Sequence, residues 1–358
     1  MTKFKAVMTF ATVLGLAAPA FAEAPLNIGF IVPNPIGEVG WDYELDRGRR
    51  EMQEHFGDKI IVTAVDSVGE GPDSTRVMNR IVAQGADVLF LGSFGHMNDG
   101  LALAKRRPDL AVLHAGGYLN EANFATYSPK HYEAAYLCGM AAGYATKNGQ
   151  LGIVAAFPLP EVLGIMNAYV LGAKNANPEI KDAKVVWLNS WFDPARNRAS
   201  AESLVAQGAD VLFSLFPGTP AAVAAAEELG VYVTTTLSDN SEFAPSKHLC
   251  AGQVNFSAIY IDQVNKVLNG SFEGVDIFAG VAEGAVEVAG LSDDLSEDQR
   301  AAIFAKQEAI RSGEFKPFSG PIVDNTGNEV VAAGNQLDAG MIKGMNFLVE
   351  GIDSELPY

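Results

Sequence analysis

The sequence V-A-Q-G-A-D-V-L-F occupies residues 82–90, and the same nine letters recur at residues 205–213. Each copy follows a helix-like run and ends in a short apolar run that is typical of a buried strand. Gly85 and Gly208 stand where a helix end favours a residue that tolerates positive φ. Because open α/β sheets bind ligands at the carboxyl ends of their strands, the repeat predicts two similar lobes whose loops face each other across a cleft.

Strand-like and helix-like runs alternate on both sides of the repeat, which predicts an α/β fold with parallel sheets covered by helices on both faces. The expected strands are Leu26–Val32, Ile60–Val65, Val88–Leu91, Leu110–Ala115, Leu151–Ala156, Lys184–Leu188, Val211–Phe213 and Val231–Thr236. The expected helices are Trp41–Phe56, Ser74–Ala83, Asp99–Arg106, Tyr132–Thr146, Val162–Asn175, Ala199–Ala206, Tyr260–Leu268 and Ser296–Ser312. We also expect a Gly-rich extended stretch at Phe278–Val288 and a turn between two strands at Val323–Glu329.

We expect the chain to cross between the lobes more than once. The N-terminal lobe would comprise residues 23–125 and about 257–290, and the C-terminal lobe residues 126–256 and about 291–358.

The N-terminal segment has the pattern of a signal peptide. Lys3 and Lys5 precede an apolar run, and Ala20-Phe21-Ala22 is a small-residue cleavage site. The apolar run is too short to span a bilayer comfortably as an anchor helix. We therefore expect residues 1–22 to be removed after Ala22 and the mature chain to be a soluble periplasmic protein.

Composition narrows the classes of partner. The chain is 48% hydrophobic and 19% charged, as globular proteins are, and its net charge is −18. Such a surface repels nucleic acid and anionic lipid. Cys138 lies in an apolar helical run. We therefore expect Cys138 and Cys250 to be buried free thiols, although an oxidising compartment would permit a disulfide.

Motifs for catalysis are missing from the sequence. The five histidines show no metal-ligand spacing, and no G-x-S-x-G, H-E-x-x-H or Walker motif occurs. The residues therefore give no reason to expect an enzyme, a metal or a cofactor.

Aromatic and small polar residues gather instead after the expected strands. Any one of them alone is typical of core or loop packing, but their coincidence indicates a cleft that holds a planar ligand by stacking, with polar contacts at the ligand's edge. Glycines there would let backbone N–H groups approach the ligand closely. The candidate ligand-binding residues are Trp41, Asp42, Ser93, Phe94, Gly117, Tyr118, Glu161, Trp191, Asp193, Phe216, Asp239 and Asn255.

Four stretches together resemble the basic membrane protein family of substrate-binding proteins, the purine-nucleoside-receptor-like components of ABC importers. The resemblance spans essentially the whole mature chain. Residues 37–48 around Gly40-Trp41-Asp42, Tyr132–Gly143 and Leu237–Pro245 carry it. Asn189–Pro194 is similar to a subgroup thought to take purine bases.

The resemblance implies a type I periplasmic binding protein fold, with two Rossmann-like lobes joined by a hinge and the ligand in the cleft between them. It also implies an ABC permease as partner. The aromatic–polar pair that contacts the base falls on Trp41 and Asp42. The aromatic residue of the opposite lobe falls near Phe216, or on whichever of Phe94 and Trp191 takes that place.

The sequence departs from the family's nucleoside-binding members in two places. They carry D-x-D-Q where this chain has Leu237-Ser238-Asp239-Asn240, and a lysine where it has Gln253-Val254-Asn255. Those charged groups would hold ribose hydroxyls. We therefore expect a purine nucleobase, such as adenine, rather than a nucleoside.

Three alternatives stay open at this point. The chain could be a nucleoside receptor of the same family, an exported enzyme on the same scaffold, or the sensory part of a signalling receptor. The lack of a nucleophile or base with a partner disfavours the enzyme, and the lack of a spanning segment disfavours the sensor.

Overall fold

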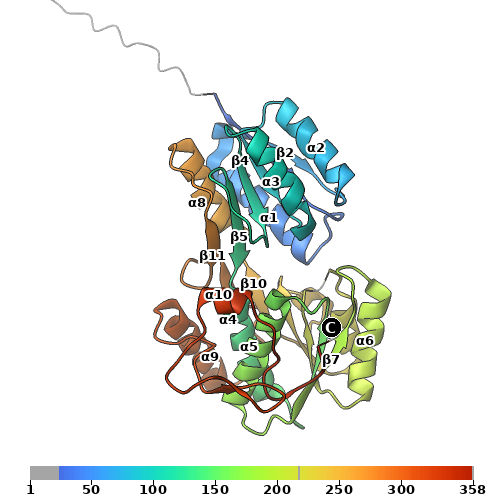
Figure 1. Ribbon diagram of the computed structural model, residues 1–358. Coiled ribbons are helices and arrows are strands. Elements are labelled where there is room, and N and C mark those ends of the chain that lie inside the picture. Colours follow the sequence, from blue (N-terminus) through green and yellow to red (C-terminus); the bar gives the residue numbers. More distant parts are fainter. Residues whose placement is uncertain (1–23, 217, 357–358) are drawn as a thin grey trace, which may run out of the picture.

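The computed structural model describes residues 24–216 and 218–356 and folds them around two separate α/β sheets (Figure 1). The leader expected at residues 1–22 lies outside the described residues. In Figure 1 the blue-to-teal part of the chain builds one lobe, and the green-to-red part builds most of the other. The orange segment, which holds α8 and β11, returns to the first lobe.

The first sheet has six strands within the described residues, in the order β11-β5-β4-β3-β1-β2, and every pair is parallel. Its strands are β1 (Leu26–Ile31), β2 (Ile60–Val65), β3 (Val88–Leu91), β4 (Ala111–Ala115), β5 (Phe124–Pro129) and β11 (Asp276–Ala279). The helices of this lobe are α1 (Trp41–Phe56), α2 (Pro72–Ala83), α3 (Met97–Arg106) and α8 (Phe256–Leu268).

The second sheet, counted over the same described residues, has seven strands in the order β12-β10-β9-β8-β6-β7-β15. Its strands are β6 (Gln150–Ala155), β7 (Asp182–Trp187), β8 (Val211–Ser214), β9 (Tyr232–Leu237), β10 (His248–Val254), β12 (Val286–Ala289) and β15 (Ile352–Asp353). The helices that accompany it are α4 (His131–Ala145), α5 (Pro160–Ala176), α6 (Pro194–Ala206), α7 (Ala221–Leu229), α9 (Glu297–Arg311) and α10 (Ala339–Lys343). A small hairpin pairs β13 (Ile322–Val323) with β14 (Glu329–Val331), around the turn expected there.

The core of each lobe lies between its sheet and its helices, because the central strands are buried on both faces. Every residue of β3 and of β8 is buried, as the continuous apolar runs predicted. Helix α2 packs so closely on its sheet that a Cβ on Gly29 would lie 2.4 Å from Ile81 Cγ2. The α/β fold expected from the alternation of strands and helices is confirmed.

The described chain passes between the sheets at three places: between β5 and α4, between β10 and α8, and between β11 and β12. These passages lie side by side. Lys130 N donates to Ala279 O at 2.6 Å, and Asn255 N donates to Ala285 O at 2.8 Å. They therefore form a multi-strand connection between the lobes, where β5 and β11 run toward the second lobe in Figure 1.

Two details of the expected organisation differ from the structure. The expected boundary at residues 125/126 falls inside β5, which pairs with β4 from Phe124 to Tyr127. Strand β12, expected in the N-terminal lobe, instead pairs antiparallel with β10 in the second sheet. The chain leaves the first sheet after Ala279, in the middle of the stretch that was expected to stay there.

The expectation of free thiols is wrong, because Cys138 and Cys250 form a disulfide with their Cα atoms 5.4 Å apart. Cys138 is on α4 and Cys250 on β10, and α4 packs directly against that strand. Both residues are fully buried. The prediction that the apolar helical run is buried is confirmed. The cysteines are not free because both lie in the same core, close enough to form a bond.

Candidate functional site

Aromatic side chains from both lobes meet where the carboxyl ends of the two sets of strands face each other. We call this group the ring cluster. It consists of Trp41, His131, Phe157, Trp191, Phe216 and Phe256, which form a connected series of ring–ring contacts. Trp41 begins α1 and Phe256 begins α8, both in the first lobe, whereas the other four belong to the second lobe.

Trp41 is the ring that the first lobe presents to the second. It follows Gly40, whose φ of 92° turns the chain into α1. Its indole Nε1 donates a 2.7 Å hydrogen bond to the carbonyl of Gly92, directly after β3, which fixes the plane of the ring. The ring meets Phe216 edge to face, with centroids 6.2 Å apart and planes at 82°. The two rings expected to sandwich a ligand are therefore in contact with each other and perpendicular rather than parallel.

Phe216 is held in an uncommon backbone conformation. Its φ is 52°, a region that side-chain-bearing residues rarely adopt. Its backbone N donates to Thr236 Oγ1 of β9 at 2.8 Å, and the residue is 9% exposed. Such conformations persist where surrounding contacts enforce them, often at ligand sites. The loop after β8 thus directs an aromatic ring toward the first lobe.

His131 and Glu161 add polar atoms beside the rings. His131 is the first residue of α4 and Glu161 is near the start of α5, and His131 Nε2 lies 3.7 Å from Glu161 Oε1. The imidazole is 1% exposed and the Glu161 side chain 40% exposed. Burial lowers the pKa of His131 to about 3, so the ring is neutral. Desolvation by the surrounding protein atoms raises the pKa of Glu161 to about 7, and the positive charge of Lys343 opposes this shift.

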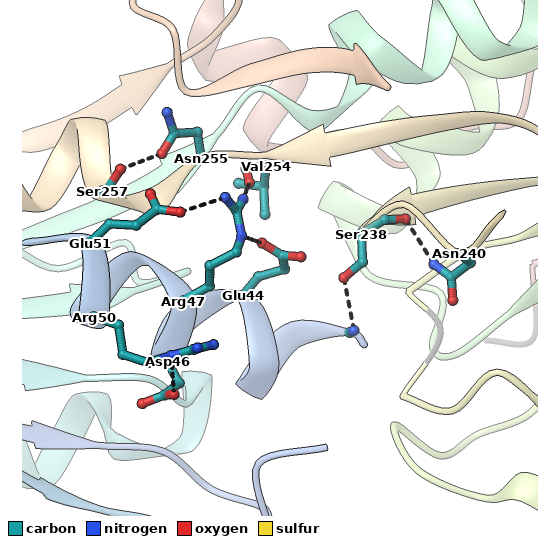
Figure 2. Close-up of polar contacts among 11 residues, drawn as sticks. Glu44, Asp46, Arg47, Arg50, Glu51, Ser238, Asn240, Val254, Asn255 and Ser257 are labelled. Atoms are coloured by element: carbon teal, nitrogen blue, oxygen red, sulfur yellow. Dashed lines mark hydrogen bonds and ion pairs between the residues drawn. The ribbon is translucent and has the colours of Figure 1, made fainter. Parts of the chain in front are cut away.

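Polar contacts also join the lobes beside the ring cluster. Figure 2 shows the Arg47 guanidinium of α1 between Glu44, Glu51 and the carbonyl of Val254, which ends β10. Gly40 N donates to Ser238 Oγ at 3.0 Å. Burial raises the pKa of Glu44 despite the nearby Arg47 charge. The two lobes are therefore in direct contact on this side of the interface.

Several candidate side chains make contacts within the protein. Asp42 accepts bonds from Asn34 N at 3.1 Å and Asn34 Nδ2 at 3.0 Å, and burial raises its pKa. Asp193 accepts from Arg196 N and caps α6. Asp239 accepts from Ser241 N.

Three further candidates are engaged in a similar way. Ser93 Oγ donates to Glu70 at 3.3 Å. Asn255 accepts from Ser257 Oγ at 2.6 Å in the passage between β10 and α8. Gly117 packs so close to His114 that a Cβ there would lie 2.3 Å from Nδ1.

Of the twelve candidates, the structure brings Trp41, Trp191 and Phe216 together and places Glu161 beside them through His131. Phe94 and Tyr118 form a separate, exposed pair with centroids 6.1 Å apart. Sequence reasoning missed His131, Phe157 and Phe256 in the ring cluster, and Arg47 and Ser238 at the interface. A histidine at the start of an apolar helix carries no pattern that would reveal its neighbours, which come from α5 and the loop after β8.

A solved ABC transporter solute-binding protein from Conexibacter woesei shares the fold. The TM-score is 0.68 at 17% identity, over 81% of this chain and 98% of that chain. Two facing α/β lobes joined by several passages define the fold class, which is type I periplasmic-binding-protein-like. The model of the Bmp family, described as ABC transporter substrate-binding protein PnrA-like, matches residues 26–316. The chain belongs to this family, so the resemblance noted in the sequence is confirmed.

Two curated relatives are similar over most of the chain. A purine-binding protein of Brucella abortus is 37% identical over 98% of this chain and its own full length. A putative ABC transporter glucose-binding protein of Haloferax volcanii is 30% identical over 93% of this chain and 81% of its own.

Residues 24–216 and 218–356 contain neither a helix that could span a membrane nor a cluster of metal-ligating side chains. None of their helices combines the length and the apolar character needed to cross a membrane. Their His, Cys, Asp and Glu side chains include no group of three or more suited to a metal ion.

Proposed function

We propose that this substrate-binding protein captures a purine nucleobase, such as adenine, between its lobes and delivers it to an ABC permease. The ring cluster carries the proposal, because it places flat rings of both lobes at the one interface that hinge motion would open. Offset or edge-on aromatic contacts add about 0.5–1.5 kcal/mol beyond area burial. The Brucella relative is named as a purine-binding protein, which supports a purine as ligand.

Ligand entry requires the lobes to separate. In the structure Trp41 touches Phe216 and Phe256, so a base can stack on the Trp41 ring only after Trp41 moves away from Phe216. The contacts between Arg47 and Val254 and between Gly40 and Ser238 would break in the same movement. The ligand then replaces the direct ring–ring contact and reconnects the two lobes.

A base is favoured over a nucleoside by the residue types at the expected ribose side. Asp239 is engaged with Ser241 N, and the Asn240 amide donates to Ser238 O in a buried position. Asn255 accepts from Ser257. These bonds leave Asn240 Oδ1 buried without a partner among the described residues. The preference for a base therefore rests on Leu237 and the uncharged Gln253-Val254-Asn255, which lack the charged groups that would hold ribose hydroxyls.

Isothermal titration of ligand-free, refolded protein tests the assignment. We expect adenine to bind more tightly than adenosine, guanosine or glucose. If a nucleoside binds far more tightly than every free base, the protein is a nucleoside receptor instead. If only glucose binds, purines are excluded as ligands.

The absence of turnover and the compartment are tested separately. Bound ligand followed by NMR over hours should stay chemically unchanged, and any product would establish an enzyme instead. We further propose a periplasmic location after removal of residues 1–22. Sequencing the N-terminus of the mature protein from a periplasmic extract should begin at Glu23.

A further inference from the structure

His131 brings into the ring cluster two polar atoms that are unpartnered within the described chain. Neither nitrogen of this buried imidazole has a hydrogen-bond partner among the described residues. A buried polar nitrogen without a partner destabilises the protein when water cannot reach it. The ring packs edge to face on Phe216, with centroids 5.4 Å apart, and lies 6.4 Å from Trp41. Withdrawal of Trp41 with the first lobe would therefore uncover the imidazole.

The polar group next to His131 is the carboxyl of Glu161, which accepts hydrogen bonds when it is ionised. The Glu161 carboxyl lies 3.7 Å from Nε2, too far for a direct hydrogen bond. Both groups stand on the second lobe, on the facing ends of α4 and α5. A neutral imidazole has one acceptor nitrogen, and its tautomer is free to place that lone pair on Nε2 because no protein partner fixes it.

Two acceptors at this spacing match one donor group. A nitrogen about 2.9 Å from each would form two ordinary N–H···N and N–H···O bonds, and only a group with two N–H bonds can supply both. A carbonyl oxygen at the same point would face lone pairs on both sides. We propose that His131 Nε2 and the Glu161 carboxylate together bind the exocyclic amine of a planar heterocyclic ligand, and so select amino-purines over oxo-purines.

The surroundings disfavour an anionic ligand edge. Two ionisable groups lie near Glu161: the neutral imidazole of His131 and the ammonium of Lys343 on α10. Lys343 is itself paired with Asp276 of β11 and lies over the Phe278 ring. The Lys343 charge is thereby engaged, and an anionic ligand edge would meet the Glu161 carboxylate. This inference rests on the proposed purine binding and adds to it the residues that read one edge of the base.

The test measures adenine and hypoxanthine affinity by titration at pH 8 for the wild type, His131→Phe and Glu161→Gln. His131→Phe keeps a ring in the cluster and removes the nitrogens, so adenine should bind roughly tenfold more weakly, with hypoxanthine little changed. Glu161→Gln supplies an amide that can donate to a carbonyl, so the preference for adenine should fall severalfold, mainly through tighter hypoxanthine binding. His55→Phe, an exposed histidine at the end of α1, is the matched control and should bind as the wild type does.

The titrations distinguish failure of the proposed function from failure of this inference. A wild type that binds no purine overturns the proposed function and this inference together. Wild-type adenine binding that both variants retain, with an unaltered preference, overturns the inference alone. If His131→Phe does not fold, ¹⁵N NMR of histidine in the wild type gives the answer. Adenine should move the His131 ring resonance while that of His55 stays in place, and an unmoved His131 resonance would refute the contact.

Discussion

The two copies of V-A-Q-G-A-D-V-L-F build the same structure in the two lobes and then diverge at their ends. Asp87 N donates to Asn27 O and Asp210 N to Gln150 O, at the same point of the neighbouring strand. The Asp87 side chain accepts from Asn27 N, and the Asp210 side chain from Lys147 N and Thr146. Strands β3 and β8 accordingly take the same place in strand orders that match from β2-β1-β3 to β7-β6-β8.

The loops that follow the two copies contribute to the ring cluster in different ways. After β3, the carbonyl of Gly92 receives the indole N–H of Trp41, so the loop orients a ring that belongs to another element. After β8, the loop itself carries the ring, and Phe216 is held at positive φ by Thr236. The repeated residues therefore specify the scaffold, whereas the first residues beyond them determine how each loop contributes to the ring cluster.

The largest expected difference between the lobes concerns the disulfide, which lies in the second lobe only and closes a loop with a sequence separation of 112. Replacing both Cys138 and Cys250 by serine should lower the free energy of unfolding by roughly 3–5 kcal/mol, since the cross-link restricts the unfolded chain. Guanidinium unfolding of the variant and wild type measures the loss. Hydrogen exchange should place it in α4 and β10 rather than in β3 and β4. A loss below about 1 kcal/mol, or equal loss in both lobes, would contradict this.

Trp41→Ala breaks the first lobe's contribution to the ring cluster. Removal of a stacked base–aromatic contact should weaken nucleobase binding by about 1–3 kcal/mol, as titration would show. Phe304→Ala, which truncates an exposed ring on α9, is the control and should leave affinity unchanged. Equal affinity of Trp41→Ala and wild type would move the site away from this interface.

Alanine at the two repeat glycines should affect the two copies unequally. Gly85 and Gly208 have φ of 97° and 105°, so alanine at either should destabilise the fold by about 1–2 kcal/mol. A Cβ on Gly85 would meet open space, but one on Gly208 would lie 2.3 Å from Gln150 Oε1. Thermal unfolding should therefore show Gly208→Ala as the less stable variant. Adding Gln150→Ala should bring the two variants closer, and no change on that addition would disprove the steric explanation.

The smallest expected effect is the pH dependence that Glu161 gives the second lobe. Its folded-state pKa, about 7, is above the usual carboxyl value, so the unfolded chain binds fewer protons between those values. Its contribution to stability is present at low pH and is lost as pH rises toward 7 and beyond. Relative to wild type, Glu161→Gln should gain stability steadily from pH 5 to pH 8, measured by urea unfolding. His131, with its lowered pKa, opposes this slope in the wild type, so the difference between the two proteins is the quantity to follow. A flat difference would contradict the raised pKa.

Sequence reasoning located the scaffold well where periodicity is strong. Helix α1 and strand β2 have the bounds that their patterns predicted. Strands β5 and β10 were missed. The first mixes Thr, Tyr, Ser and Pro, and the second contains polar and glycine positions, so neither has the apolar run of a buried strand. Both strands lead into passages between the lobes, where packing against distant segments decides the conformation.

The candidate site was predictable only in part, for a related reason. Rings that directly follow or begin elements at the strand ends, such as Trp41 and Phe216, can be found because the fold dictates where strands end. The contact between His131 and Glu161 depends on how α4 packs on α5. The side chains of Asp42 and Asp193 were plausible ligand contacts by type, yet their bonds to Asn34 and Arg196 depend on local loop geometry that residue type does not specify.

The return of the chain to its first sheet through β11 has a consequence for synthesis. Strand β5 leaves the ribosome with one backbone edge unpaired, and its parallel partner, Asp276–Ala279, follows only after most of the second lobe. An open strand edge invites pairing with other chains. A single cut therefore cannot yield two self-sufficient halves: a fragment ended after Pro129 would be prone to self-association until a peptide carrying the missing strand is added back.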